Sequence, residues 1–412
     1  MRILLLAPHP FFQQRGTPIA ERMLLEVLAA NGHEIDVLTF AEGEDVQIPG
    51  CRFLRIPRLP GTSGIRPGFS WKKLANDAVM LVESLRLIRR HRYNLVHAVE
   101  ESAFMALVGK WLFRVPYVYD MDSGLAQQMI DKFRPLGRVR PLLEVFERSA
   151  ARGSAGVLAV CRSLEEQARA WNPGGLVQRI EDVTLLEGNG KVLHLGTDLQ
   201  IPLGLDGVRP PVVMYVGNLE PYQGIDLLIE AFRQALRRAP RALLVLVGGA
   251  AGDIERYRER AERLGITASV HFAGPRPVER LGSYLRQATV LVSPRIHGTN
   301  TPMKVYSYLD SGRPLLATRL PTHTQVLTDD VALLVEPEPE AMSVGLVSLL
   351  EDEVLRERLA DNARELAQRE FTPQAFERKL LNFYDAVTEK TGGTWIHGGE
   401  TARLEAGRQS RR

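Results

Sequence analysis

Short apolar runs, each followed by a segment with helical periodicity, recur along the first part of the chain. Ile3–Ala7 is the first run, and a helix is expected over Ile19–Ala30, with an apolar face made of Met23, Leu24, Val27 and Leu28. Continuous apolar runs are typical of parallel strands that are buried on both faces. Further strands are expected at Glu34–Phe40, Leu95–Val99, Tyr117–Tyr119 and Val157–Val160. This alternation predicts a doubly wound parallel sheet.

The same alternation restarts after Leu199–Pro211, a segment rich in proline and glycine that we interpret as a linker. Beyond it a helix is expected from about Ile225 to Arg238. Strands are expected at Val212–Val216, Ala242–Val247, Val270–Phe272, Val290–Val292, Leu315–Ala317 and Ala332–Val335. The chain therefore predicts an α/β protein with two Rossmann-like domains that face one another, residues 1–200 and 201–371.

A last amphipathic segment opens at Thr372-Pro373. It predicts a helix over residues 372–390 whose apolar positions are Phe376, Leu380, Phe383 and Val387. The strand count of the second domain is complete without this helix, so we expect it to pack elsewhere. The remaining residues, 391–412, are rich in glycine and arginine and are expected to be disordered.

Composition narrows the class of protein. The chain has 412 residues, 45% hydrophobic and 25% charged, which excludes disorder, collagen and coiled coil as descriptions of the whole. The net charge of +3 is too small to indicate nucleic acid as the main partner. Cys51 and Cys161 can form neither a disulfide framework nor a four-cysteine zinc site. No apolar run reaches the ~18 residues of a membrane span, so we expect a soluble, cytoplasmic protein.

The first candidate for chemistry is the loop Pro8–Pro18, between the first strand and the first helix. Ligands of doubly wound sheets bind outside the carboxyl ends of the strands. A glycine turn before a helix lets backbone N–H groups face an anion or a sugar hydroxyl, and Arg15, Gly16 and Thr17 stand at that point. The alternative is a surface loop held by its prolines.

Two further loops join a strand to a helix in the second domain. Tyr215–Ile225 carries Gly217, Asn218 and Gln223, where a nucleotide would place its phosphates. Taken alone this is a weak signal, because many strand–helix turns contain two glycines. The sequence of a P-loop is absent.

The loop Ser293–Lys304 has stronger chemistry. Its small polar residues Gly298, Thr299, Asn300 and Thr301 stand among three basic ones, Arg295, His297 and Lys304. Such a loop at a helix N-terminus suits a diphosphate. Lys304 falls in the first helical turn, where the helix dipole disfavours a cation unless it serves an anion. For His297 the alternative is a capping or core hydrogen bonder.

Carboxylates follow two neighbouring strands of the first domain. Asp120 and Asp122 end the strand at Tyr117–Tyr119 and would orient an acceptor hydroxyl or take its proton. The alternative is an Asx turn with a helix cap at Ser123. Glu100 and Glu101 follow Leu95–Val99 and are expected at the same place. His97 alternates inward on its strand and is interpreted as a satisfied core histidine.

Residues 51–75 combine basic and aromatic side chains, namely Arg52, Arg55, Arg58, Arg66, Phe69, Trp71, Lys72 and Lys73. This composition would suit contact with anionic lipid and hence a lipid-linked acceptor. The alternative, which we favour slightly, is a solvated loop with Trp71 packed inward.

Taken in order, these segments resemble the GT-B glycosyltransferases, above all the retaining family 4, over residues 1 to about 390. Asn31-Gly32 ends the first helix, and His194-Leu195-Gly196-Thr197-Asp198 stands where the family has Asn-Gly-x-Asp. Val216–Leu219 with Gln223-Gly224 matches the phosphate loop. Leu246–Gly249 and Phe272–Gly274 follow at the expected intervals. His297-Gly298…Pro302 and Ser307–Thr318 match the family's Glu-Gly-x-Gly-x-Pro and Gly-x-Pro-Val-x-Ala segments.

The chain also departs from the family pattern. Asn218 and Gln223 replace the Arg and Lys of the phosphate loop. His297 replaces the first of two family glutamates, and the second falls near Val305 to Ser307, where there is no carboxylate. Asp122 is nearest to the position of the catalytic histidine. As a hypothesis, Lys304, Arg295 and His297 restore the missing charge.

The resemblance implies transfer of a sugar from a nucleotide-diphosphate sugar to an acceptor hydroxyl of a glycan or lipid-linked molecule, with retention and without metal or cofactor. The second domain would hold the donor, with Gly248 and Ser307 among its contacts. The first would hold the acceptor, with Arg15–Thr17, Glu100 and Glu101, and residues 372–390 would cross back to it. Asp122, Asp120 and His297 are the expected catalytic residues.

Three other functions stay open on the sequence alone. A nucleotide-sugar epimerase would use the same fold without an acceptor. A non-catalytic binding protein would explain the missing glutamates and cations. An NAD dehydrogenase is disfavoured, because Gly248–Gly252 lacks the Gly-x-Gly-x-x-Gly spacing.

Overall fold

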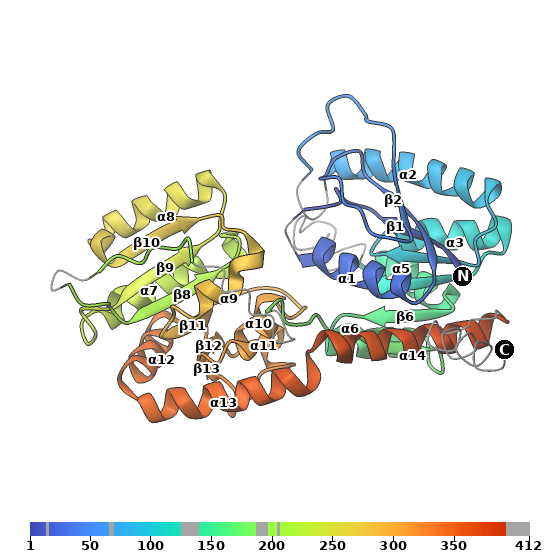
Figure 1. Ribbon diagram of the computed structural model, residues 1–412. Helices are drawn as coiled ribbons and strands as arrows, with labels where there is room; N and C mark the ends of the chain where they lie inside the picture. The colour runs from blue at the N-terminus through green and yellow to red at the C-terminus, as the bar shows by residue number, and fades with distance from the viewer. Residues whose placement is uncertain (14–15, 66–69, 125–139, 187–196, 204–206, 393–412) are drawn as a thin grey trace, which may run out of the picture. The chain divides into compact units, whose positions relative to one another are not determined.

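The computed structural model describes residues 1–13, 16–65, 70–124, 140–186, 197–203 and 207–392 (Figure 1). They form two compact units, one of residues 1–181 together with the last helix from Glu377, and one of Asp182–Phe376. Each unit is built on a parallel sheet covered by helices (Figure 1). The predicted α/β class with two Rossmann-like domains is confirmed.

Within its described residues, the first unit has a seven-stranded sheet in the order β3-β2-β1-β4-β5-β6-β7, with all neighbours parallel. The strands are β1 Arg2–Ala7, β2 Glu34–Thr39, β3 Cys51–Arg55, β4 Leu95–Val99, β5 Tyr117–Met121, β6 Gly156–Ala159 and β7 Val177–Arg179. The helices are α1 Gly16–Ala30, α2 Trp71–Arg90, α3 Ser102–Phe113, α5 Arg140–Gly153 and α6 Arg162–Trp171. The strand order reverses between β1 and β4, and ligands bind beside such a switch point.

The sequence analysis missed two strands, β3 and β7, which are the two edges of this sheet. Neither strand has a continuous apolar run, because Arg52 and Arg55 interrupt β3 and Gln178 and Arg179 follow Val177 in β7. In β3 the exposed Arg52 lies between two half-buried residues, and its Nε lies 2.7 Å from Oδ1 of Asp36 on β2. The beginning of the basic stretch 51–75 is therefore part of the sheet and not a loop.

The second unit has a six-stranded parallel sheet, in the order β10-β9-β8-β11-β12-β13. The strands are β8 Val212–Val216, β9 Leu243–Val247, β10 Val270–Gly274, β11 Val290–Ser293, β12 Leu315–Thr318 and β13 Leu333–Val335. The helices are α7 Ile225–Ala235, α8 Ala251–Arg263, α9 Leu281–Leu285, α10 Lys304–Asp310, α11 Pro321–Thr324, α12 Pro339–Glu351 and α13 Glu353–Glu370. Alternate residues of β8 enter different cores, Val212 and Met214 on one face and Val213 and Tyr215 on the other.

The division between the units falls at Glu181, before the expected linker. Thr184 already belongs to the second unit, because its hydroxyl donates to Asp310 at 2.9 Å. The next backbone N–H, that of Leu185, donates to Ser307 Oγ at 2.9 Å. A search for proline and glycine could not detect these two contacts.

Helix α14, Pro373–Thr391, begins in the second unit and belongs to the first from Glu377 onward. Its predicted apolar positions Phe376, Leu380, Phe383 and Val387 are all buried, which confirms that face. Gly156 of β6 makes room for the helix, since a Cβ there would lie 2.8 Å from the ring of Phe383.

The helix α1 buries a different face from the one expected. Leu24 and Leu28 are buried as predicted, but Leu25 and Glu21 complete the buried stripe, while Met23 and Val27 are half-buried. A carboxylate was not expected there, and its surroundings belong to the candidate site below.

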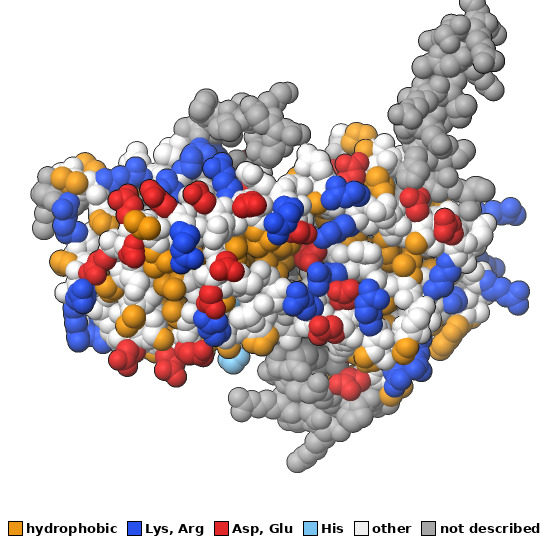
Figure 2. Space-filling view, turned by 90° about the horizontal axis from the view of Figure 1, so that it is seen from below, with side chains coloured by type: hydrophobic (Ala, Val, Ile, Leu, Met, Phe, Trp, Pro, Cys, Tyr) orange, Lys and Arg blue, Asp and Glu red, His pale blue; other side chains and the backbone are white. Residues whose placement is uncertain are grey.

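Figure 2 shows one face of the molecule, on which basic and acidic side chains are interspersed and hydrophobic ones lie between them. Among the described residues, none of the helices has the length and apolar character needed to span a bilayer.

Candidate donor and acceptor sites

The two polar loops of the second unit come together at the carboxyl ends of β8 and β11, which are neighbours in the sheet. The backbone N–H of Ile296 donates to the carbonyl of Tyr222 at 3.0 Å. Gly224, with φ of +75°, allows this approach, because a Cβ there would lie 1.9 Å from the carbonyl oxygen of Pro294. The two loops therefore lie side by side.

Lys304 lies at the centre of this junction. Its Nζ donates to Oε1 of Gln223 at 2.9 Å and stands 3.8 Å from the centre of the Tyr215 ring. A Cβ on Gly217 would lie 3.1 Å from the same nitrogen. Burial, and then the charge of Arg295, lower the pKa of Lys304 well below its usual value. A cation from α10 thus stands against the first loop.

Arg295 is buried and donates mainly into its own loop. Nε donates to the carbonyl of His297 at 2.7 Å, and the two terminal nitrogens donate to the carbonyl and side chain of Asn300 at 3.2 and 3.1 Å. Its guanidinium carbon lies 5.3 Å from the centre of the Tyr222 ring. Burial lowers the pKa of Arg295. Arg295 therefore fixes the shape of residues 297–300 and adds positive charge beneath them.

The remaining predicted donor residues differ in accessibility. His297, Gly298 and Thr299 are exposed, so the interpretation of His297 as a core residue is wrong. Thr301 is buried, and its Oγ1 has no hydrogen-bond partner among the described residues. Gly298 needs to be glycine, since a Cβ there would lie 2.2 Å from the Arg295 guanidinium.

Ser307, Gly248 and Asn218 have structural contacts. Ser307 is fully buried, and its Oγ accepts the Leu185 N–H described above. A Cβ on Gly248 would lie 2.2 Å from the carbonyl oxygen of Gly217, so this glycine allows β9 to approach the first loop. The exposed Asn218 caps its own turn, accepting from the N–H of Glu220 at 3.3 Å.

Sequence reasoning missed His323, which lies beneath the donor loops. It is fully buried between Ser293 and Thr318, with its two nitrogens 2.8 and 3.0 Å from their hydroxyls. Burial lowers its pKa to about 3, so the imidazole is neutral. Histidines spaced this far from a motif give no sequence signal.

In the first unit, polar side chains gather at the carboxyl ends of β1, β4 and β5. Ser123 Oγ donates to Glu100 Oε1 at 2.9 Å. The alternative of a helix cap at Ser123 involves residues that lie outside the described ones. Glu100 itself has φ of +48°, and its backbone N–H donates to the carbonyl of Asp120 at 2.9 Å. Asp122 follows, half-buried. Glu100, Asp120 and Asp122 therefore share one edge of the sheet, as predicted.

His97 is fully buried, as expected of a core histidine, but it also contacts the candidate site. Its Nε2 lies 3.0 Å from Oδ2 of Asp120, and its Nδ1 lies 2.7 Å from the hydroxyl of Tyr384 on α14. The ring therefore orients Asp120 from below.

Glu101 points elsewhere than expected. Its carboxylate contacts the ammonium of Lys73 on α2, which also lies 3.8 Å from Glu100. Burial raises the pKa of the neighbouring Asp77 to about 8. Glu101 therefore belongs to a buried ion cluster that joins α2 to α3 and is not open to an acceptor.

His9 and Glu21 belong to the same group of polar side chains at the carboxyl ends of the strands, and they were not predicted from the sequence. Nε2 of His9 lies 3.2 Å from Oε2 of Glu21, and both residues are buried. Burial, and then the charge of Asp120, raise the pKa of Glu21 well above its usual value. In the sequence, the only indication of Glu21 was a carboxylate on an otherwise apolar face of a helix.

The predicted loop residues Arg15, Gly16 and Thr17 can be placed only in part. Gly16 is the first residue of α1 and is exposed, and Thr17 follows, half-buried. Arg15 lies outside the described residues. Within the described residues, histidine, cysteine and carboxylate side chains form no group of three that could hold a metal ion.

The chain matches two families over most of its length. Residues 206–366 match the family "Glycosyl transferases group 1", and residues 16–179 match "Glycosyl transferase 4-like domain". The chain belongs to the group 1 glycosyltransferases. It is an enzyme of that class, and the fold is GT-B, as the resemblance implied.

Similar proteins extend this finding over the whole chain. The D-inositol 3-phosphate glycosyltransferase of Corynebacterium glutamicum is 28% identical and covers 97% of this chain and 100% of that protein. The phosphatidyl-myo-inositol mannosyltransferase of Mycobacterium tuberculosis is 24% identical, with 94% and 97% covered. The structure of Anabaena HepE in complex with UDP-glucose has a TM-score of 0.69 at 18% identity, with 94% and 100% covered.

Proposed function

We propose that this glycosyltransferase takes its sugar from a nucleotide-diphosphate donor, and that Lys304 supplies the charge that the loop Gly217–Gly224 lacks. The contact of Lys304 with Gln223 carries this proposal, because it brings a cation to the loop whose family counterpart holds two. Arg295 supports the second loop. UDP-glucose bound to the structural neighbour HepE agrees with a donor of this class.

The chemistry follows from the position of the cation. Departure of the leaving group places negative charge on the diphosphate, and preorganised cations and N–H groups lower that barrier most. The N-termini of α7 and α10, at the ends of the two loops, add backbone donors. In retaining transfer without a metal, the leaving phosphate takes the acceptor proton. Asp120 and Asp122 then orient the acceptor hydroxyl.

For the acceptor we propose a polyhydroxylated molecule, a glycan or a lipid-linked cyclitol, bound at Glu100, Asp120, Asp122 and the pair His9–Glu21. Carboxylates that follow neighbouring strands can accept from several hydroxyls of one molecule, and Glu21, whose pKa is raised by burial, can also donate when it is protonated. Relatives named for inositol 3-phosphate and phosphatidyl-myo-inositol agree with a cyclitol acceptor.

A calorimetric titration with UDP, GDP, ADP and NAD⁺ tests the donor class. Binding of one nucleoside diphosphate, weakened at least tenfold by Lys304→Met, is the expected result. Binding of NAD⁺ would contradict the proposal, and no binding of any of the four compounds would favour a non-catalytic binding protein. Turnover of the donor without any acceptor would favour an epimerase.

The stereochemistry and the metal need separate measurements. With the donor that binds, NMR of the anomeric proton in the product distinguishes retention from inversion. The same reaction in excess EDTA should proceed at an unchanged rate. Inversion, or loss of turnover that added magnesium restores, would refute these two parts of the proposal.

Peripheral contact with the cytoplasmic face of the membrane is the last part of the proposal. The side chain of Trp71 is 76% exposed at the start of α2, so the expected inward packing is wrong, and Leu74 beside it is also exposed. Arg52, Arg55 and Lys73 are paired with carboxylates, so the exposed Trp71 and Leu74, with the exposed Arg58 and Lys72, remain as the contact. An exposed tryptophan is well suited to a membrane interface. Arg66 and Phe69 lie outside the described residues.

Vesicle pelleting tests this contact. Trp71→Ala should reduce binding to vesicles that contain anionic lipid, while Val354→Ala, an equally exposed apolar residue of α13, should not. Equal binding of the two variants, or none at all by the wild type, would exclude the membrane contact without affecting the donor site.

A further inference from the structure

The second unit holds a cavity at the opposite end of its sheet from the donor loops. Its volume is about 400 Å³. Pro211 and Thr289, which line it, directly precede β8 and β11, and Arg313 comes shortly before β12. The donor loops follow the carboxyl ends of β8 and β11, so the parallel strands separate the two places by their own length.

The walls of this cavity are basic. Arg209, Arg286, Arg313 and Arg356 line it, and none of its lining residues is acidic. Among the described residues, no carboxylate lies within 4.0 Å of the guanidinium groups of Arg209, Arg286 or Arg313. Arg356 lies 3.8 Å from Glu353, whose side chain is mostly exposed. Other arginines of the described residues also lack a carboxylate partner, and what distinguishes Arg209, Arg286 and Arg313 is that they line one hollow.

The hydrogen bonds that these arginines make leave their charge uncompensated. Arg209 donates to the side-chain oxygen of Gln287 at 3.1 Å, and Arg313 donates to the carbonyl of Arg286 at 2.6 Å. Arg356 donates to the carbonyls of Leu349 and Leu350 at 3.0 and 3.1 Å. All these acceptors are neutral. A guanidinium has five N–H groups, so each arginine keeps donors for a further partner.

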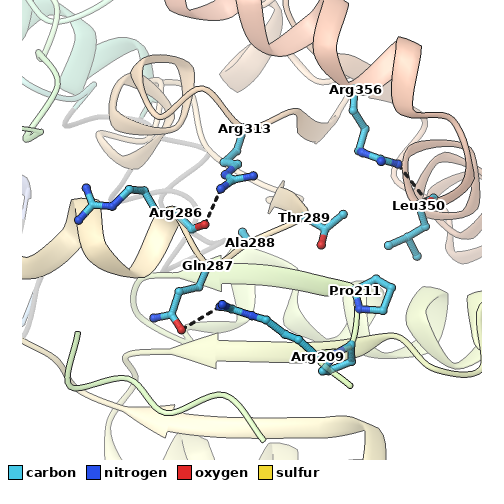
Figure 3. A pocket seen from close by; sticks show the side chains of 10 residues that line it. Arg209, Pro211, Arg286, Gln287, Ala288, Thr289, Arg313, Leu350 and Arg356 are labelled. Carbon is cyan, nitrogen blue, oxygen red and sulfur yellow. Dashed lines mark hydrogen bonds between the residues drawn. The ribbon is translucent and has the colours of Figure 1, made fainter. Parts of the chain in front are cut away.

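Figure 3 shows how the lining side chains lie. Thr289 stands among Arg209, Arg313 and Arg356, while the guanidinium of Arg286 points outward, away from them. Burial, and then the charge of Arg209, lower the pKa of Arg313, so these two cations are close enough to repel each other. An anion between them would remove that repulsion.

The dimensions and chemistry indicate the kind of anion. Planar guanidinium forks match the oxygens of phosphate and bind it at two points. Small-molecule sites typically have about 300–1,000 Å³, so this cavity is larger than phosphate alone requires. Pro210, Ala288 and Leu350 give it an apolar side for a carbon skeleton.

We propose that this cavity is a second binding site, separate from the donor site, for a phosphate monoester about as large as a sugar phosphate. Arg209 and Arg313 hold the phosphate, and Arg356 and Thr289 complete the site. The ester comes either from a soluble phosphorylated metabolite or from a phospholipid headgroup, and these two sources share the chemistry that the arginines recognise.

Calorimetric titration of the full chain with glucose 6-phosphate tests the soluble source. The expected result is saturable binding that weakens as salt rises and falls at least tenfold in Arg313→Ala and in Arg209→Gln. Lys304→Met should bind the ester as the wild type does, which separates this site from the donor site. Arg263→Ala, an exposed arginine of α8 in the same unit, is the matched control.

Pelleting with phosphatidylcholine vesicles, with and without phosphatidic acid, tests the lipid source. Loss of binding to the acidic vesicles in Arg209→Gln and Arg313→Ala, without loss in Arg263→Ala, would assign the ester to a lipid. Because Arg209 is exposed, Arg209→Gln should fold normally, and a melting curve checks this. Binding in neither assay, or binding that depends on Lys304 and not on Arg313, would overturn the proposal and leave the proposed donor site unaffected.

Discussion

The ammonium nitrogen of Lys304 donates a hydrogen bond of 2.9 Å to the side-chain oxygen of Gln223, 81 residues away in the sequence. The two residues meet because β8 and β11 are neighbours in the sheet and each is followed by a loop that leads into a helix. Gln223 is buried and Lys304 is half-buried. The family pattern has a lysine at the position of Gln223, and here a lysine of the adjoining loop lies against that position instead.

Exchanging the two side chains tests whether it matters which of the two loops carries the lysine. Lys304→Gln should lower the affinity for the donor nucleotide roughly 10- to 100-fold, since a hydrogen bond to a charged group contributes about 1.5–3 kcal/mol. Adding Gln223→Lys should recover most of that affinity, because the ammonium returns to the same junction from the other loop. Calorimetry with the nucleotide that binds the wild type measures both.

Gln223→Lys alone is the informative control for this exchange. It places two ammonium groups at one buried junction, so it should destabilise the second unit while the double variant does not. If the double variant bound no better than Lys304→Gln, the position of the charge at this junction would not be what the donor requires.

Binding of the diphosphate should raise the pKa of Lys304, so it should take up protons at any pH where the free amine is partly neutral. Burial holds the pKa of Lys304 well below its usual value in the free protein, and a neighbouring dianion favours the charged amine. The complex then binds more protons than the free protein, so affinity should fall as pH rises. Calorimetry in two buffers with different ionisation enthalpies measures the uptake. Lys304→Met should abolish it, and an uptake that persists in Lys304→Met would assign the proton to another group.

The neutral His323 should make the second unit sensitive to acid. Its pKa is about 3 when folded, against 6.5 for the free side chain, so the unfolded chain binds a proton first as pH falls. The titration of His323 therefore leaves the free energy of unfolding unaffected above about pH 6.5 and lowers it between pH 6.5 and 3. In that range the equilibrium constant for unfolding rises by up to about tenfold per pH unit.

His323→Gln removes this titration. The variant should be less stable at neutral pH, because it loses contacts with Ser293 and Thr318, but its stability should depend less on pH in the acidic range. Urea unfolding at several pH values measures both effects. The exposed His297→Gln is the control and should keep the slope of the wild type; an equal slope in His323→Gln would contradict the assignment.

The sequence was sufficient for the architecture because buried parallel strands leave a continuous apolar run. β4 and β8 were predicted with their observed bounds, and the apolar face of α14 was predicted position by position. The strands β3 and β7 were not predicted because polar residues interrupt them, Arg52 and Arg55 in β3 and Gln178 and Arg179 in β7. Boundaries set by single hydrogen bonds, such as the one between Thr184 and Asp310, have no periodic signal at all.

The candidate sites were predictable as loops and not as contacts. Glycines and charges next to a strand end identified Gly217, Arg295 and Lys304, but pairing across loops depends on distances that a sequence does not contain. Glu101 shows this limit, since it shares a motif with Glu100 and yet binds Lys73. Glu21 shows the reverse, because a carboxylate on an apolar helical face was not interpreted as part of a site.

The hydrogen bond between Tyr384 and His97 should fix the tautomer of the imidazole. Burial, and then the charge of Asp120, raise the pKa of Tyr384 well above its usual value, so its hydroxyl is protonated and can donate to Nδ1 at 2.7 Å. The other nitrogen, Nε2, then carries the hydrogen that faces Asp120.

Tyr384→Phe keeps the ring and removes this donor. It should reduce the free energy of unfolding by about 1–3 kcal/mol, because a buried nitrogen loses its partner. The ¹⁵N shifts of the His97 ring should move towards a mixture of tautomers, and nucleotide affinity should stay unchanged because the donor loops belong to the other unit. Tyr284→Phe is the matched control, since its hydroxyl donates to Asp198 at 2.8 Å in the second unit and its loss should leave the His97 shifts unchanged. Unaltered His97 shifts in Tyr384→Phe would mean that Asp120 alone sets the tautomer.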